Sequence, residues 1–532
     1  MKMKKIKSFI AVLTAVTLCG CINIKTEEST MNKGDQIKIG WAKNDITPQG
    51  PAFLAGQMFH RLALEVHDPL LTSAMAVESG NEKFIMISLD NIKFRSHLMD
   101  RVREKVSAAT GVPQLNIIGS ATHTHTAPRY GDIVPREYWH KSYKSPLNIG
   151  SGINGIDIEE VRKKHPDLVD SKDYFFFLVD KISDCAIRAW QNRQPGKIAY
   201  GMGEAAVGEC RRIVLNGEGG VMYADEALEN VSHAEGHVDH SLNIMATYLP
   251  NGKLTGLIIN IACPAQVNEA QSFISSDYWH CVREAVAKTY GTDVVILPQC
   301  SAAGDQSPHK IMNRKADARM MQLRSQLKEP VADWTWSSRA FNKAYNEARC
   351  QEISRRIMTS LTEVLKVIEP TADAAPVVKH TVRDLALQPR LITESEYAEA
   401  LANVKKIESE MAKTNSKEYN FALNRNKGVV NRYNTQAKEV FRELHVIRMG
   451  GAAFATNTFE LYLDYGDRIK GASKADQTFL VQLASAESGT YLPSRRSGTT
   501  GYGNTPQSCI VTPEAGDTIV KESVKEINRM FE

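Results

Sequence analysis

Two histidines lie two residues apart in residues 120–128, directly after the short apolar run 115–119. Side chains at i and i+2 of an extended segment point the same way, so His123 and His125 face one crevice at the end of this predicted strand. Neutral imidazole is a common zinc ligand, and the Ser, Thr and Pro neighbours offer no hydrophobic partner for the rings. The pattern favours a metal site, although a pair of histidines in a loop is also often incidental.

A second segment rich in small residues, 299–308, follows the predicted buried strand 293–297. Its glycine and alanines let the backbone approach a ligand, and Ser307 stands where a hydroxyl could meet a substrate carbonyl. The same composition also suits a plain tight turn between a strand and a helix. The sequence contains no Gly-x-Ser-x-Gly elbow and no His-Glu-x-x-His motif, so an ordinary serine hydrolase or a zincin is not supported.

Two further candidates come later in the chain. Glu460 ends a strand-like stretch that begins at Ala453, and Tyr491 precedes a Gly/Ser-rich loop at residues 497–505. They would offer a carboxylate and a phenol to a site. Taken singly, a surface acid and a packed aromatic ring are the simpler interpretations.

The elements that must position these residues alternate between strands and helices. Nearly continuous β-branched runs predict strands buried on both faces, at residues 83–89, 115–119, 254–261 and 293–297. Amphipathic stretches predict helices at residues 97–109, 174–192, 277–290 and 339–368. This order predicts an α/β fold, a single large domain over residues 37–532 in which helices flank a central mixed or mainly parallel sheet.

Other segments add to this frame. Residues 393–444 are charged and have few turn signals, which predicts a helical hairpin packed outside the sheet, and a last helix is expected to end at residue 531. Residues 129–170, rich in Tyr, Trp, Pro and Gly, and residues 310–338, polar and basic, are interpreted as insertions. Long segments between regular elements usually carry function or specificity.

The composition is that of an ordinary globular protein. The 532 residues are 42% hydrophobic and 24% charged, which excludes disordered and collagen-like classes. Lys and Arg number 65 against 61 Asp and Glu, a formal charge of +4, and four of these lysines lie within the first seven residues. Without them the charge is 4 − 4 = 0, which argues against a nucleic-acid binder that neutralises phosphates.

The N-terminal residues predict export and a lipid anchor. A basic start precedes an apolar run at residues 9–18 that is too short to span a bilayer. Leu18-Cys19-Gly20-Cys21 resembles a bacterial lipobox, so we expect a signal peptide at residues 1–20, acylation of Cys21 and a flexible tether at residues 21–36. The expected location is the bacterial cell envelope, at the periplasmic face or the cell surface, anchored without spanning. A plain secretory signal with a chance cysteine is the alternative.

These motifs, in this order, resemble the N-terminal catalytic domain of the neutral/alkaline (non-lysosomal) ceramidase family. The likeness runs from residue 37 to the last helix and includes the opening residues 37–48, residues 55–61 and the Ile-Ser-Ser-Asp block at 274–277. The His-Thr-His motif is the most specific part. The resemblance implies a zinc-dependent hydrolase with one zinc ion per chain, acting on a small-molecule or lipid amide such as ceramide.

In that family two histidines, a glutamate and a tyrosine hold the zinc ion. Carried over by position, the first histidine falls on His123, the glutamate on Glu460 and the tyrosine on Tyr491. The resemblance also implies that Ser307 is the active-site serine and that His125 lines the site, where it would act as a general acid. Tyr502 would bind substrate, although the spacing around it differs slightly from the family's.

The chain departs from the family at the second zinc histidine, whose position is held by Cys263 in a Cys-Pro pair. Thiolate is a good zinc ligand, with Zn–S about 2.3 Å against Zn–N about 2.0–2.1 Å. Its charge would, however, make a metal-bound water less acidic. The alternatives are that His280 or His240 replaces it or that the site holds no metal. A thiol enzyme with Cys263 as nucleophile is a further alternative.

Two functional classes remain open from the sequence. The leading hypothesis is a lipid-anchored zinc hydrolase of a ceramide-like N-acyl bond, or of another amide, ester or glycan-linked substrate. The runner-up is a binding lipoprotein that kept the fold and lost the reaction. The sequence shows no strand-rich module after the last helix, whereas ceramidases carry a C-terminal immunoglobulin-like domain, which weakens the case for ceramide itself.

Overall fold

The computed structural model describes residues 34–130, 158–217, 219–224, 228–331, 334–413, 421–484, 490–498 and 500–532. The expected signal peptide, Cys21 and the tether up to residue 33 lie outside these residues, as does most of the predicted insertion at 129–170. Residues 34–532 form one compact unit.

The first large sheet carries the strand that leads to His123. Its strands are β1 (Lys38–Asp45), β4 (Leu71–Ser79), β5 (Glu82–Leu89), β6 (Ile117–Ala121) and β7 (Gln194–Pro195). They lie in the order β6-β5-β4-β1-β7, and β5 and β6 are the parallel pair. The helices α1 (Ser96–Thr110) and α3 (Ser171–Gln191) bury their apolar side chains against one face of this sheet, in a cluster that includes Leu98 and Leu178.

The second large sheet follows the same plan. Its strands are β8 (Lys197–Glu204), β13 (Ser241–Tyr248), β14 (Leu254–Ile261) and β15 (Val295–Cys300). They lie in the order β15-β14-β13-β8, and β14 and β15 are parallel. The helices α4 (Tyr278–Tyr290) and α7 (Lys343–Ile368) cover one face through residues such as Val282 and Ile357.

The third large sheet is built from later residues. Its strands are β17 (Val378–Leu387), β18 (Val440–Met449), β19 (Ala452–Thr456) and β21 (Gln477–Val481), in the order β17-β18-β19-β21, with β19 and β21 parallel. The helices α10 (Leu463–Ala472) and α11 (Pro513–Met530) pack on it through residues such as Ile469 and Ile519.

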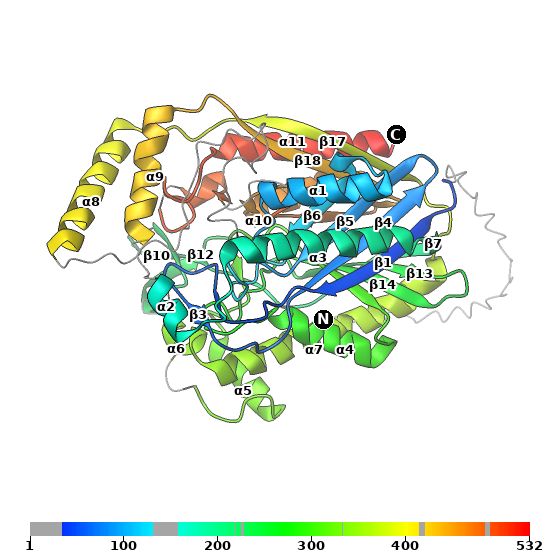
Figure 1. The fold of residues 1–532 in the computed structure, drawn as a ribbon, viewed down its shortest axis with the longest axis horizontal. Helices are drawn as coiled ribbons and strands as arrows, with labels where there is room; N and C mark the ends of the chain where they lie inside the picture. The colour runs from blue at the N-terminus through cyan, green and yellow to red at the C-terminus, as the bar shows by residue number, and fades with distance from the viewer. Residues whose placement is uncertain are drawn as a thin grey trace, which may run out of the picture. The chain divides into compact units, whose positions relative to one another are not determined.

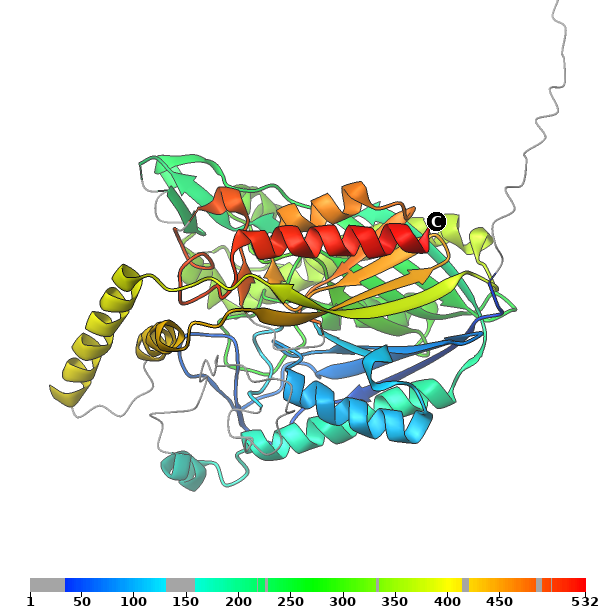
Figure 2. The same cartoon turned by 90° about the horizontal axis from the view of Figure 1, so that it is seen from above.

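The inner faces of the three sheets share one hydrophobic core. It joins Phe84 from the first sheet, Ile258 from the second, and Phe454 and Phe479 from the third. Figure 2 shows α1 and α3 on one side of the sheets and α11 on the opposite side. Because each sheet meets helices on one face and this core on the other, its strands are apolar on both faces, as their near-continuous hydrophobic runs predicted.

Shorter elements complete the fold. The remaining strands are β2 (Ala52–Phe53), β3 (Leu62–Ala63), β9 (Glu209–Cys210), β10 (Arg212–Leu215), β11 (Gly219–Met222), β12 (Val231–Ala234), β16 (Gln306–Ser307), β20 (Glu460–Leu461) and β22 (Tyr491–Leu492). The remaining α-helices are α2 (Ile158–Lys164), α5 (Arg314–Leu323), α6 (Trp336–Ala340), α8 (Glu394–Lys413) and α9 (Phe421–Thr435). Two of the short ladders, β9 with β16 and β20 with β22, hold candidate site residues.

The predicted α/β class is confirmed. The strands, expected in one central sheet, are divided among three larger mixed sheets, each with one parallel pair. The short connections from β4 to β5, from β13 to β14 and from β18 to β19 form antiparallel hairpins, and longer connections join the other antiparallel neighbours. The predicted helical hairpin is present as α8 and α9, which pack side by side in Figure 1, although β18 already begins at Val440. In the part of the chain that the structure describes, no helix is long and apolar enough to cross a membrane.

Candidate active site

The parallel strand pairs of the three large sheets end at one place. His123 follows β6, Ser307 follows β15, and Glu460 follows β19. Backbone hydrogen bonds tie these ends together, from Ala265 to Thr122 (3.1 Å), from Gly304 to Leu461 (2.8 Å) and from Gln482 to Cys300 (3.0 Å). Ligand sites of α/β proteins lie in the crevice beyond the carboxyl ends of such strands. Residues far apart in the sequence therefore meet here.

His123 is held in a fixed orientation. Its φ of 66° lies in the left-handed region, which is uncommon for a residue other than glycine and is often found at functional sites. The ring Nδ1 lies 2.7 Å from the carbonyl oxygen of Ile92. A carbonyl only accepts, so Nδ1 carries a proton, and Nε2 is the ring nitrogen left to face the site.

The other ring nitrogen of His123 faces a carboxylate. The Nε2 of His123 lies 3.5 Å from Oε2 of Glu460, and both side chains are buried. The distance exceeds the 2.7–3.2 Å typical of a protein hydrogen bond. Burial would raise the pKa of Glu460, but the neighbouring His123 outweighs it, together with Lys93 and a hydrogen bond from Tyr491, and lowers this pKa to about 2. The carboxylate is therefore ionised at any physiological pH.

Tyr491 lies beside Glu460 because β20 and β22 pair in parallel with these two residues in register. Burial and the charge of Glu460 raise the pKa of Tyr491 well above its ordinary value. The guanidinium of Arg211 donates to the Tyr491 hydroxyl at 3.0 Å and to the Gly304 carbonyl at 2.9 Å. Arg211 is buried, and sequence analysis did not single it out. It places a fixed positive charge next to the phenol.

A second buried cluster, also missed by sequence analysis, lies beside the first. Oε2 of Glu269 is 3.7 Å from Nδ1 of His125, and its Oε1 is 3.3 Å from Nε2 of His309. Burial would raise the pKa of Glu269, but its contact with His309 and the charge of Arg211 outweigh this and lower it. Sequence proximity was the available signal, since His309 comes two residues after Ser307.

His125 connects the two clusters. Its ring lies 5.1 Å from that of His123, centroid to centroid. The amide of Gln266 lies 2.7 Å from its Nε2, and a donated N–H there places the ring proton on Nδ1, which faces Glu269. Burial lowers the pKa of His125 well below its ordinary value, and the neighbouring His123 adds to the effect. The neutral ring is therefore the favoured form.

Ser307 belongs to the second cluster. It is fully buried, and its Oγ lies 3.4 Å from the hydroxyl of Tyr223. The same Tyr223 hydroxyl donates to Oε1 of Glu269 at 3.2 Å. Tyr223 has a φ of 68°, again in the left-handed region, so its backbone is also held in an uncommon conformation. Tyr223 thus links Ser307 to the carboxylate between the two imidazoles.

Tyr502 lies near the predicted site. Its ring is 5.4 Å from the ring of Tyr491 in an edge-on arrangement, and the guanidinium of Arg425 lies over its other side at 5.2 Å. Burial raises the pKa of Tyr502. It can therefore act as a neutral hydrogen-bond donor next to Tyr491.

Cys263 is the predicted residue that the structure does not bring to His123. Its side chain packs in the hydrophobic cluster between the second sheet and the helices α4 and α7. Its Sγ lies 3.6 Å from the carbonyl of Pro264. Burial raises its pKa well above the ordinary value, which disfavours the thiolate that ligation or nucleophilic attack requires.

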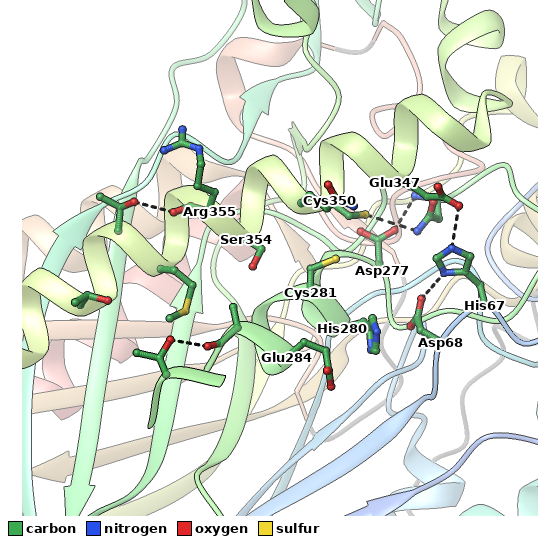
Figure 3. Close-up of a pocket in the computed structure, with 17 residues that line it drawn as sticks. His67, Asp68, Asp277, His280, Cys281, Glu284, Glu347, Cys350, Ser354 and Arg355 are labelled. Carbon is green, nitrogen blue, oxygen red and sulfur yellow. Dashed lines mark hydrogen bonds and ion pairs between the residues drawn. The ribbon is translucent and has the colours of Figure 1, made fainter. Parts of the chain in front are cut away.

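The two histidines proposed as replacements are also elsewhere. His280 lies on α4 and lines a cavity of about 1040 Å³ between α4 and α7, together with His67 and Glu284. Figure 3 shows this cavity, which is lined by none of His123, Glu460 and Tyr491. Nδ1 of His240 is buried without a hydrogen-bond partner. The backbone carbonyl of His240 accepts a hydrogen bond from the N–H of Ala205.

Within the described ranges, no group of three or more His, Cys, Asp or Glu side chains could hold a metal ion. A metal at His123 and Glu460 therefore needs a donor of another type. The phenol of Tyr491, paired in register with Glu460, is placed to be that donor.

No family model matches the chain, and no curated protein sequence matches it. Among solved structures, the neutral ceramidase from Pseudomonas aeruginosa matches with a TM-score of 0.63 at 16% identity, covering 93% of this chain and 75% of that chain. A structure described as a ceramidase complexed with C2 matches with a TM-score of 0.60 at 14% identity, covering 92% of this chain and 74% of that chain. The sheets, helices and connections described above are thus those of a known architecture, and this chain has the fold of the neutral ceramidases.

Proposed function

We propose that this chain is a metal-dependent hydrolase of an N-acyl amide with a ceramide-like bond. The observation that carries the proposal is the placement of His123 and Glu460. An imidazole nitrogen and a carboxylate oxygen face each other at 3.5 Å, buried at the end of three parallel strand pairs. The fold shared with ceramidases supports the same reaction class.

The residues fit a zinc ion. Bonds of about 2.0–2.1 Å place two ligand atoms of a tetrahedral ion about 3.3–3.4 Å apart, close to the 3.5 Å between His123 Nε2 and Glu460 Oε2. The hydrogen bond from His123 Nδ1 to a backbone carbonyl is the usual support of a metal-binding imidazole. His123, Glu460 and Tyr491 would hold the ion, and three protein ligands leave the open position typical of catalytic zinc.

The side chains around the site suggest a role for each in the reaction. A zinc ion held there would polarise the scissile carbonyl and lower the pKa of a water molecule. Arg211 offers a preorganised positive charge where negative charge develops on the substrate. The hydroxyl of Ser307 would donate a hydrogen bond to the substrate, while Tyr223, which donates to Glu269, would hold Ser307 in place. Glu269 would also hold the Nδ1 proton of His125 toward the second cluster.

The proposal includes an envelope location. The support is the segment Leu18 to Cys21, which resembles a lipobox and is followed by polar residues. Acylation of Cys21 would tether the enzyme to the membrane that holds lipid amides. A substrate panel that varies the acyl group and the headgroup identifies the preferred amide.

A second candidate function is a binding lipoprotein that does not turn over its ligand. Its support is Cys263, which stands where the resemblance places the family's second zinc histidine and packs in a hydrophobic core. Loss of one nitrogen ligand lowers metal affinity, and a weakly held ion would leave a binding pocket without its electrophile.

Metal quantification tests the proposal. Wild-type protein should carry about one zinc ion per chain, and His123→Ala should lose it along with about a thousandfold of N-acyl amide turnover, since metal polarisation contributes several kcal/mol. His233→Ala, which changes an exposed histidine, is the matched control and should keep both. Wild type without a transition metal would contradict the proposal. Ligand binding that survives His123→Ala, without turnover, would favour the binding lipoprotein.

A further inference from the structure

A series of aromatic rings leads from the candidate site to the protein surface. The ring of Tyr223, whose hydroxyl lies 3.4 Å from Ser307, is 5.9 Å from that of Trp336. Trp336 lies 6.4 Å from Phe341, and Phe341 stacks on Phe59, again at 6.4 Å between centroids. All of these separations fall in the range of aromatic contacts. The series joins the Lys310–Ser338 region of the sequence to the loop between β2 and β3.

The outer end of this series is exposed. Phe341 is 53% exposed, Phe59 is 42% exposed and the adjacent Met58 is 46% exposed. Single exposed apolar side chains are ordinary, but a group of large ones in contact costs solvation and marks an interaction surface. Both phenylalanines also lie next to regular elements, since Phe341 follows α6 and Phe59 precedes β3.

The helix α5 lies near α6 in Figure 1. Its exposed residues include basic and large apolar side chains. A hydrogen bond of 2.7 Å from Arg339 of α6 to the carbonyl of Lys310 ties the two segments. Met320 and Leu323 are 39% and 62% exposed, and Lys315 and Arg319 are exposed beside them. Cations mixed with large apolar side chains on one helix are typical of segments that lie on a membrane surface.

The charge of this region differs from that of the rest of the chain. Residues 310–343 contain eight Lys and Arg against three Asp and Glu, a net charge of 8 − 3 = +5. The whole chain carries 65 − 61 = +4, so all other residues together carry 4 − 5 = −1. Five of the basic residues of this region are exposed at the surface, namely Lys315, Arg319, Arg324, Lys328 and Lys343. An anionic surface is the complementary partner.

We propose that Met58, Phe59, Phe341 and the exposed side of α5 form a docking face for a lipid surface that carries anionic headgroups. The phenyl rings enter the headgroup–acyl boundary while Lys315 and Arg319 contact the anionic headgroups. This inference rests on the proposed function for its purpose, because a docked bilayer presents lipid amides at the outer end of the ring series that leads to Ser307.

Vesicle binding by residues 34–532, the compact unit without the expected lipid anchor, tests the docking face. Wild type should sediment with phosphatidylcholine–phosphatidylglycerol vesicles more strongly than with pure phosphatidylcholine vesicles. The double variant Phe59→Ser/Phe341→Ser should lose about tenfold or more in partition coefficient, because two apolar side chains no longer enter the boundary. Lys315→Glu/Arg319→Glu should lose at least about fivefold for each basic side chain, and only on the anionic vesicles.

Two matched controls change the same residue types elsewhere. Phe441→Ser alters a phenylalanine of β18 that is 52% exposed, and Lys405→Glu/Lys406→Glu reverses two exposed lysines of α8. Both should bind vesicles like wild type. Equal binding to the two vesicle types, equal losses in the controls, or a change of oligomeric state with Phe59→Ser/Phe341→Ser in place of reduced vesicle binding would overturn the proposal.

A second readout separates this inference from the proposed function. Lys315→Glu/Arg319→Glu should hydrolyse a water-soluble short-chain N-acyl amide like wild type while losing hydrolysis of the same amide embedded in anionic vesicles. Vesicle binding without any turnover by wild type would refute the proposed function and leave the docking face standing. Turnover by wild type without charge-dependent vesicle binding would refute the docking face alone.

Discussion

Two buried His–Glu pairs in this chain consist of the same residue types but differ in their surroundings. His445 and Glu443 lie 3.1 Å apart on β18, and His123 and Glu460 lie 3.5 Å apart at the candidate site. In the first pair, Glu443 accepts two hydrogen bonds from Arg103, at 2.8 and 2.9 Å, and Nδ1 of His445 contacts Nε2 of His380 at 3.1 Å.

The difference teaches what separates a structural pair from a potential ligand pair. On β18, both ring nitrogens of His445 and both oxygens of Glu443 have partners in the protein, which leaves no lone pair for a ligand. At the candidate site, one ring nitrogen of His123 is fixed by a backbone carbonyl and the other faces a carboxylate beyond usual hydrogen-bond distance. Burial and residue type are the same, and only the completeness of the network differs.

The largest expected effect is a loss of stability when the fully hydrogen-bonded pair on β18, Glu443 and His445, is broken. Glu443→Ala should lower the free energy of unfolding by about 3–5 kcal/mol, because it leaves the buried Arg103 without its counter-charge. Urea unfolding followed by circular dichroism measures this change. The zinc content of the folded fraction should stay that of wild type, whereas Glu460→Ala should empty the site. Zinc loss in Glu443→Ala would break the distinction between the two pairs.

The next largest effect is a loss, at low pH, of the stability that Glu443 contributes. Burial would raise the pKa of Glu443, but the hydrogen bonds from His445 and Arg103 outweigh it and lower this pKa from 4.5 to about 2. A depressed folded-state pKa contributes stability above the ordinary value and loses it as pH falls toward the folded value. The stability advantage of wild type over Glu443→Gln should therefore shrink by about 3 kcal/mol between about pH 6 and about pH 2. A constant difference across that range would contradict the assigned pairing.

A smaller effect is expected in the second cluster. Glu269→Gln should reduce N-acyl amide turnover about 10- to 100-fold, the usual cost of removing a group that orients a site residue. Its zinc content should be unchanged, because Glu269 contacts His125 and His309 and not His123. Glu347→Gln, at the rim of the cavity in Figure 3, is the matched control and should keep full turnover. Zinc loss in Glu269→Gln would place this carboxylate in the metal site.

The smallest effect is expected at Cys263. Cys263→Ala should cost about 1 kcal/mol of stability by removing one buried atom from a packed cluster. Zinc content and turnover should match those of wild type. A loss of zinc in this variant would show that Cys263 does ligate the metal. The zinc ion would then have a fourth protein ligand besides His123, Glu460 and Tyr491.

Much of the fold could be predicted from local pattern. The strand over residues 254–261 is found with the same bounds, and the helices predicted over 97–109 and 277–290 appear as α1 and α4 within one residue of those bounds at each end. Such segments are defined by apolar periodicity alone. The division into three sheets was not predictable in this way, because each parallel pair depends on which distant strand lies beside it.

For the candidate site, the sequence by itself determined the residue types that end each buried strand, including His123, Ser307 and Glu460. Only the tertiary structure decided which of them meet. It brought Glu460 to His123 across more than 300 residues of chain, added Arg211, Glu269 and His309 from separate loops, and kept Cys263 in a hydrophobic core. The physical reason is that strand ends follow from local patterning, whereas the contacts of a buried polar group depend on the packing of three sheets around a common core.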